Sequence, residues 1–375
     1  MDKHHYMAPV ARAPVADPKL FRPDWTVGVP RDPNLLWLDK NENTDPELAK
    51  LTARLLSEID STAIYSYPEC TPLYHKLAGH LGVKADNLLL AAGSDGAIRS
   101  VFEAFINPGD VVVHTAPTFA MYAVYSSMYG AKVIPLIYQA SDNGPTLAVE
   151  DVVNTIKKVQ PKLVCLPNPD SPTGTVFSPS DMRQIVEAAG KVGALILIDE
   201  AYYPFYEHTV VPWVDEYNHL VVTRTFAKAW GISGLRIGYA VSCPDVARLL
   251  HKVRPMYEVG TVAVALAERL LDFSREILAS VRRINAGRDA FLKAMAALQL
   301  RTLITHGNFL HVAFGQYASA VHERLKKVVL YRLDGGEGCL KGFSRFSATT
   351  VERFHPIIKQ IQQVINEKGD ARHEK

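Results

Sequence analysis

The chain has 375 residues, of which 48% are hydrophobic and 21% charged, and its 41 basic and 39 acidic side chains leave a net charge of +2. This composition excludes a disordered, collagen-like or small disulfide-rich protein. The balanced charge argues against nucleic-acid binding, for which a basic surplus is typical, and no segment approaches the ~18 consecutive apolar residues of a membrane span.

The first 34 residues predict an N-terminal arm. Pro9, Pro14 and Pro18 favour an extended segment that is either disordered or wrapped around a partner subunit. The segment contains no apolar run of the kind that forms the core of a signal peptide. The 4 cysteines lie far apart and include no CxxC pair, so they indicate neither a disulfide framework nor a metal site. We therefore expect a cytoplasmic protein without a bound metal.

Short apolar segments alternate with helical patterns between residues 86 and 245. Residues 194–198 (Ala-Leu-Ile-Leu-Ile) are apolar at every position, which is typical of a strand covered on both faces. The pattern therefore predicts an α/β domain whose sheet lies between helices. The expected strands are residues 88–91, 111–114, 133–137, 163–166, 194–198, 220–223 and 237–241.

Helical spacing predicts the elements between and after these strands. Ser94 and Asp95 can cap a helix whose apolar positions recur at helical spacing up to Phe105, and a second helix is expected over residues 178–189. Beyond residue 260 the pattern changes, and this change predicts a second, smaller α+β domain. Its expected elements are helices over 262–286 and 290–298, a strand over 309–313 and a closing helix over 350–367.

Three loops after predicted strands contain residues that are unusual for simple turns. Ligands of α/β sheets bind at the carboxyl ends of the strands. Residues 93–96 (Gly-Ser-Asp-Gly) open a helix whose amides could hold a phosphate, although capped helices after glycine turns are common. Residues 168–174 (Asn-Pro-Asp-Ser-Pro-Thr-Gly) form either a rigid functional loop or an ordinary turn. Asp199 follows a buried strand, so we expect a cationic partner, unless a helix cap or a structural ion pair satisfies it.

The fourth loop contains Lys228 between Phe226 and Trp230. Apolar surroundings lower the pKa of a lysine because they disfavour the ammonium form, and the neutral amine is then available for Schiff-base chemistry. A single lysine in a loop is usually just exposed. Its combination with Asp199, the proline-rich loop and the glycine turn favours a functional site.

Taken together and in this order, the four motifs resemble those of the fold-type I pyridoxal-phosphate aminotransferases of class I and II. They are Gly-Ser-Asp at 93–95, Asn-Pro-x-x-Pro-Thr-Gly at 168–174, Asp-Glu-Ala-Tyr at 199–202 and Thr-x-x-Lys-x-x-Gly-x-x-Gly-x-Arg-x-Gly at 225–238. Asn-Glu-Asn at 41–43, Tyr-Pro at 67–68 and Asn-Phe at 308–309 are most similar to the histidinol-phosphate aminotransferase-like branch. The resemblance implies a large domain (51–261) with a mostly parallel seven-stranded sheet, and a small domain (35–50 and 262–375).

The resemblance also implies which residues hold pyridoxal 5'-phosphate. Lys228 would bind the cofactor as a Schiff base and move the proton at the substrate α-carbon. Asp199 would pair with the pyridine nitrogen, and Tyr202 would hydrogen-bond the ring oxygen. The remaining cofactor-binding positions are Ser94, Asp95, Gly96, Phe119, Asn168, Ser171, Thr225, Arg236 and Tyr67.

Substrate and partner contacts follow from the same resemblance. Arg345 matches the arginine that holds the substrate carboxylate, Arg332 matches a second anion contact, and Asn43 belongs to the substrate-binding positions. Tyr67 matches a residue that reaches the cofactor phosphate of the neighbouring subunit, which implies a homodimer with composite sites.

Five positions depart from the residues usual in this family. Ser171 stands in place of an asparagine and Ala227 in place of a serine, so two contacts to the cofactor are weakened or lost. Gly96 stands in place of a glutamate, and Thr-Asp at 44–45 in place of Pro-Tyr. Cofactor binding should survive these changes, whereas a role in histidine biosynthesis does not follow from them.

The expected activity is transfer of an amino group from a donor such as glutamate to a small keto compound, phosphorylated or not, by ping-pong chemistry through Lys228. Decarboxylation of a phosphorylated amino acid, such as phosphoserine or phosphothreonine, is an alternative. The reaction depends on which bond of the α-carbon is held perpendicular to the ring, and motif spacing does not reveal that. An inactive regulatory protein with the same fold is a further alternative.

Overall fold

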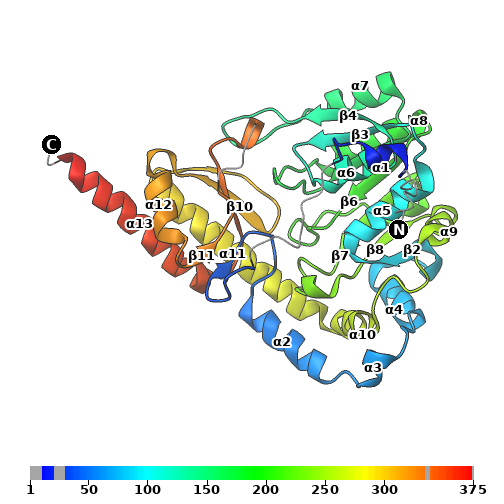
Figure 1. Cartoon of the computed structure of the whole chain (residues 1–375), viewed down its shortest axis with the longest axis horizontal. Helices are drawn as coiled ribbons and strands as arrows, with labels where there is room; N and C mark the ends of the chain where they lie inside the picture. Colours follow the sequence, from blue (N-terminus) through cyan, green and yellow to red (C-terminus); the bar gives the residue numbers. More distant parts are fainter. Residues whose placement is uncertain (1–10, 21–29, 334–337, 374–375) are drawn as a thin grey trace, which may run out of the picture.

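The computed structural model describes residues 11–20, 30–333 and 338–373 (Figure 1). Within these ranges the largest sheet is seven-stranded, with the strand order β2-β8-β7-β6-β5-β3-β4. β8 pairs antiparallel with both of its neighbours, and the other pairs are parallel. The predicted α/β fold with a mostly parallel seven-stranded sheet is therefore confirmed. The strands are β2 (Leu88–Ala91), β3 (Val111–Ala116), β4 (Lys132–Ile137), β5 (Leu163–Pro167), β6 (Leu195–Asp199), β7 (Leu220–Thr225) and β8 (Gly238–Ser242).

Helices cover both faces of this sheet, which is why its central strands are apolar at nearly every position. All side chains of β5, β6 and β7 are buried. Alternate residues of each strand point into two separate cores, one on each face. The first core is closed by α2 (Pro46–Ser57), α4 (Thr71–Leu81), α7 (Val149–Val159), α8 (Pro179–Lys191) and α10 (Thr261–Leu270). The second is closed by α5 (Gly93–Phe105), α6 (Met121–Met128) and α9 (Pro244–Val253).

A third core lies around a small antiparallel sheet of order β12-β10-β9. The parallel pair β1 and β11 lies beside this core, to which Leu38 and Val329 contribute. The elements are β1 (Leu36–Trp37), β9 (Arg301–Leu303), β10 (Phe309–Ala313), β11 (Val329–Leu330), β12 (Ser344–Ser347), α11 (Ser274–Ala297), α12 (Ala318–Leu325) and α13 (Val351–His373). Two short helices, α1 (Ala13–Ala16) and α3 (Thr62–Tyr65), complete the α-helices of the described residues. None of these helices is both long and apolar enough to cross a membrane, over the residues that the structure describes.

The long helix α11 connects the cores. Ile277, Val281 and Ile284 in its first half pack into the core of the large sheet, whereas Phe291 and Met295 pack into the small one. The domain division at residues 50/51 and 261/262 stays a prediction, because this helix belongs to both cores.

Two expectations from the sequence are wrong in detail. The helix expected over 262–286 ends at Leu270, and a 3-10 turn at Leu271–Phe273 separates it from α11. The break expected at 287–289 is absent, because α11 continues through it. A side chain at Gly287 would overlap the backbone of Thr349 and Thr350, so this glycine permits close packing and does not end the helix.

The N-terminal arm is only partly described. Residues 13–16 form the single turn of α1, which lies against α6, and Arg12 donates a 3.5 Å hydrogen bond to the carbonyl of Met128. The expected extended conformation is therefore wrong at Pro14, while Pro9 lies outside the described residues.

Candidate active site

A cavity of about 180 Å³ lies where strands β5, β6 and β7 end. Ligands of α/β sheets bind at this edge because several loops meet there. The cavity is lined by predicted site residues that come from the segments after five strands, β2, β3, β5, β6 and β7. They are Ser94, Asp95, Phe119, Ser171, Asp199, Tyr202, Thr225, Lys228 and Arg236, with Pro167, Ala201 and Ala227 completing the lining.

Asp199 is the last residue of β6 and is 4% exposed. Its carboxylate accepts hydrogen bonds from the hydroxyls of Thr223 (3.0 Å) and Tyr122 (3.2 Å) and from the amide of Ala201 (3.1 Å). Burial raises the pKa of Asp199 to about 6. Tyr122 was not predicted from the sequence, because an aromatic residue at helical spacing is more typical of a core.

The predicted cationic partner of Asp199 is not a side chain. Among the described residues no ion pair reaches Asp199, and the nearby Arg224 is already paired, at 2.7 Å, with the buried carboxylate of Glu200. A buried carboxylate that faces a cavity without an ion-pair partner is costly unless a cation enters from outside the chain. A protonated pyridine ring is such a cation, so Asp199 fits pyridoxal phosphate.

Lys228 follows the end of β7 and projects into the same cavity. Its Nζ donates a 2.9 Å hydrogen bond to the carbonyl of Lys40 and lies 5.9 Å from the ring centre of Tyr202. Burial, with a further contribution from the charge of Arg345, lowers the pKa of Lys228 to about 8. About a tenth of the amine is therefore neutral and nucleophilic at pH 7, far more than for an ordinary lysine.

This lowered pKa predicts how fast the cofactor-free protein takes up pyridoxal phosphate. Only the neutral amine attacks an aldehyde, so the rate should rise roughly tenfold per pH unit below 8 and level off above it. Stopped-flow absorbance between pH 6 and 9 measures this rate, with Nα-acetyl-lysine, a free lysine side chain whose amine titrates at about 10.4, as the control. A midpoint near that of free lysine would contradict the buried environment.

An anion-binding cup lies at the N-terminus of α5. The amides of Ser94 and Asp95 begin this helix, and the guanidinium of Arg236 lies against Gly93. A Cβ at Gly238 would lie 2.6 Å from the Ser94 nitrogen and 2.6 Å from the Arg224 carbonyl, so only glycine lets the strand pass so close. Helix amides together with an arginine fork suit a phosphate group.

Tyr202 connects this cavity to the small sheet. Its hydroxyl accepts a 2.8 Å hydrogen bond from the side-chain Nδ2 of Asn41 and also interacts with the side chain of Ser171. Burial raises the pKa of Tyr202, so the phenol keeps its proton. Asn41 adopts a left-handed φ of 57° and is held by Ser347 and Asn308. Its role was missed from the sequence because only the fold brings it to Tyr202.

The loop that contains Ser171 is anchored by a buried carboxylate. Asp170 accepts hydrogen bonds from the hydroxyls of Thr115 (2.5 Å), Thr118 (2.8 Å) and Tyr138 (2.9 Å). Thr118 immediately precedes Phe119, whose ring lines the cavity. These bonds therefore fix two walls of the cavity relative to each other.

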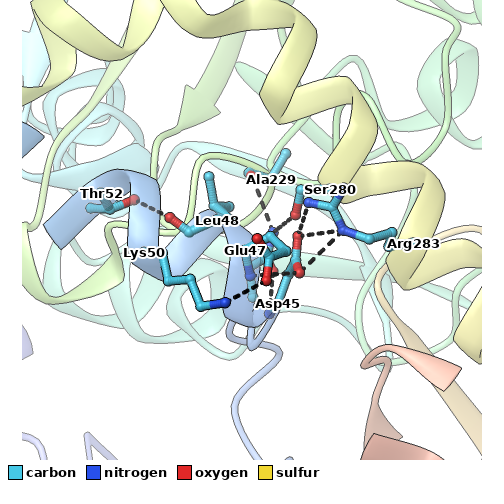
Figure 2. A network of polar contacts seen from close by, with 9 residues as sticks. Asp45, Glu47, Leu48, Lys50, Thr52, Ala229, Ser280 and Arg283 are labelled. Atoms are coloured by element: carbon cyan, nitrogen blue, oxygen red, sulfur yellow. Dashed lines mark hydrogen bonds and ion pairs between the residues drawn. The ribbon is translucent and has the colours of Figure 1, made fainter. Parts of the chain in front are cut away.

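Asn43, predicted to bind substrate, is not among the residues that line the cavity. Its amide group donates to the Ala229 carbonyl and to the Ser280 hydroxyl, both at 3.1 Å. Figure 2 shows the surrounding network, in which Asp45 caps α2 and pairs with Arg283 of α11 at 2.5 Å. Asp45, one of the departures from the family pattern, thus has a structural explanation, and these contacts position the backbone beside Lys228.

The two predicted substrate arginines lie side by side. Arg332 and Arg345 pair through their backbones, and both guanidinium groups donate 3.2 Å hydrogen bonds to the carbonyl of Asp39. Arg345 is close enough to affect the pKa of both Tyr202 and Lys228. A substrate anion at this pair would therefore lie next to the amine.

Three further predicted residues lie outside the cavity lining. Asn168 accepts a hydrogen bond from the Phe177 amide and so shapes its own loop. Gly96 faces the carboxylate of Glu258, which would lie 2.8 Å from a Cβ at this position. Tyr67 is 72% exposed and stacks on Tyr257 at 4.1 Å, so within a single chain it does not reach the cavity.

The sequence matches one family model, described as aminotransferase class I and II, over residues 33–361. It is 33% identical over 332 residues to the histidinol-phosphate aminotransferase of Thermoanaerobacter pseudethanolicus. The aligned region covers 88% of this chain and 92% of that protein. The histidinol-phosphate aminotransferase of Caldanaerobacter subterraneus subsp. tengcongensis is 30% identical over 334 residues, or 88% and 93% of the two chains.

Solved structures share the fold. Histidinol-phosphate aminotransferase from Sinorhizobium meliloti, in complex with pyridoxal-5'-phosphate, superposes with a TM-score of 0.76 at 22% identity, over 88% of this chain and 91% of that one. Aspartate aminotransferase from Thermus thermophilus with maleate gives 0.73 at 21% identity, over 88% and 92%.

Proposed function

Because this chain belongs to the class I and II aminotransferases and uses their cofactor pyridoxal 5'-phosphate, we propose that it moves an amino group from an amino acid donor to a small keto compound through Lys228. The observation that carries this proposal is that one cavity holds both a lysine of lowered pKa and a buried carboxylate that forms no ion pair within the described part of the chain.

The cofactor, when bound, supplies an aldehyde that condenses with amines and a ring that accepts the electron pair released at the α-carbon. Lys228 would provide the amine to which the cofactor is attached, and as a free amine it would take up and return the proton of the substrate α-carbon. Asp199 would keep the ring nitrogen protonated, and Tyr202 would donate a hydrogen bond to the ring oxygen. Ser94, Asp95 and Arg236 hold the phosphate.

The anionic ends of the substrates are assigned to Arg345 and Arg332. Glutamate is the proposed donor, since its carboxylates suit two adjacent guanidinium groups. The acceptor is proposed to be a small keto compound, phosphorylated or not. The relatives are named for histidinol phosphate, and that compound's keto precursor is one member of this class.

The active form is proposed to be a homodimer in the cytoplasm. An exposed apolar surface surrounds Tyr67 and includes Ile64 (82% exposed), Tyr65 (77%) and Met256 (78%). A surface of this kind is typical of a protein interface. Burying it against a second copy would let Tyr67 reach the phosphate cup of the partner, which would complete both sites.

A donor and acceptor screen tests the proposed function. The holoenzyme is mixed with one amino acid at a time, and the absorbance band of the aldehyde form is expected to give way to that of the amine form. Glutamate should give the fastest change, and a keto acceptor should reverse it. Release of carbon dioxide from phosphoserine or phosphothreonine without this change would instead indicate decarboxylation. An aldehyde band that stays unchanged with every amino donor would indicate an inactive protein with the same fold.

A further inference from the structure

Arg31 lies between two carboxylates of the segment that precedes α2. Its Nη2 is 3.0 Å from Oδ1 of Asp39, and its Nη1 donates to both carboxylate oxygens of Glu42 at 3.0 Å. The guanidinium also covers the ring of Trp37 at 4.9 Å. The three charged side chains are 15%, 10% and 27% exposed, so water screens their charges only in part.

The same short segment forms one wall of the active site. The carbonyl of Lys40 accepts from the Lys228 amine, and the carbonyl of Asp39 accepts from Arg332 and Arg345. Asp39 and Glu42 therefore belong to the segment that contacts both arginines assigned to the substrate and also the Lys228 amine.

The electrostatics of the site agree with this placement. The charge of Glu42 acts to raise the pKa of Lys228, and the charge of Asp39 acts to raise the pKa of Arg345. Each carboxylate is thus near a cation of the site while it is paired with Arg31. A carboxylate attached to the wall of a site competes with a dissolved anion at a high effective concentration.

We propose that Arg31 is a positioning residue that holds Asp39 away from Arg345 and Arg332, and Glu42 away from Lys228, and so keeps the two arginines free for the substrate and the amine free for the cofactor. The inference rests on the proposed assignment of Arg345 and Arg332 to the substrate anion. Without Arg31 the two carboxylates pair with these cations, and the site is occupied by the protein's own acids.

Binding of succinate to the holoenzyme, measured by calorimetry, tests this role without any reaction. The Arg31→Ala variant is expected to bind succinate about tenfold more weakly. This factor corresponds to the loss of one partly screened ion pair between succinate and the site. The triple variant Arg31→Ala/Asp39→Asn/Glu42→Gln should recover wild-type affinity to within about threefold, because the amides keep the shape but carry no charge. Arg248→Ala, which removes an exposed ion pair with Asp245, is the matched control and should change nothing.

The outcomes separate this role from a purely structural one. If Arg31 only anchored its segment, the triple variant would bind as poorly as Arg31→Ala, and the proposal would be overturned. Unchanged binding by Arg31→Ala, or no succinate binding by the wild type, would overturn it as well. If succinate binds and the triple variant recovers, but no amino donor changes the cofactor spectrum, the proposed function fails while this inference stands. With an active donor, Arg31→Ala should raise KM and leave kcat within about twofold.

Discussion

Replacing Lys228 with alanine is expected to abolish covalent attachment of the cofactor and to slow the reaction with an amino donor by about four orders of magnitude or more. Alanine provides neither an amine for attachment nor a base for the α-proton, while the phosphate cup and Asp199 remain intact. Single-turnover absorbance with glutamate measures the rate. Mass spectrometry after borohydride reduction locates the attachment, which should be at residue 228 in the wild type and absent in the variant.

Lys252→Ala is the control for this experiment, because Lys252 is an exposed lysine on α9 and no described contact brings it to the cavity. Added methylamine should restore part of the lost rate, since a free amine can enter the space that the lysine side chain vacates. Reduction that still fixed the cofactor to the variant would show that another residue carries it.

The second large effect is expected from Asp199→Asn. The amide has nearly the same shape and keeps hydrogen bonds to the hydroxyls around it, but it carries no charge. The ring nitrogen then loses the partner that keeps it protonated, and the ring accepts electrons less well. The reaction with glutamate should slow by about a hundredfold to a thousandfold, measured by single-turnover absorbance.

Cofactor affinity separates this effect from misfolding. Affinity should fall far less than the rate, because the phosphate contacts remain, and fluorescence titration with pyridoxal phosphate measures it. Asp245→Asn, at an exposed carboxylate on α9, is the matched control. If Asp199→Asn reacted with glutamate as fast as the wild type, this carboxylate would have no role in the reaction.

The strands could be predicted because burial on both faces leaves a plain pattern. Residues 194–198 are apolar throughout, and the structure places β6 at Leu195–Asp199. The boundary between α10 and α11 could not be predicted, because neither glycine nor proline marks the turn at Leu271–Phe273. Conversely, Gly287 suggests the end of a helix, but the helix continues through it. The glycine allows the backbone of Thr349 to pack closely against the helix, and only the folded chain brings the two together.

The cavity residues were predictable where a motif places them directly after a strand, as for Asp199 and Lys228. The residues that hydrogen-bond the cavity residues were not predictable, because Asn41 and Tyr122 come from elements that are distant in the sequence. The departure at Gly96 has a similar explanation. Glu258 points its carboxylate at Gly96 from a segment far along the chain and accepts a 3.3 Å hydrogen bond from the Ala92 amide. An acidic group is thus present beside Gly96, where the family usually has glutamate, but the sequence alone could not reveal it.

Helix α11 limits where this chain can be cut into fragments that fold independently. A fragment that ended at residue 261 would lack Ile277, Val281 and Ile284, which complete the core of the large sheet. Each such side chain contributes about 1.5–3 kcal/mol when fully buried, so their joint loss approaches the whole free energy of unfolding of a typical protein. The separated halves would therefore be poor candidates for independent expression, and fusion or permutation points are better sought in surface loops away from this helix.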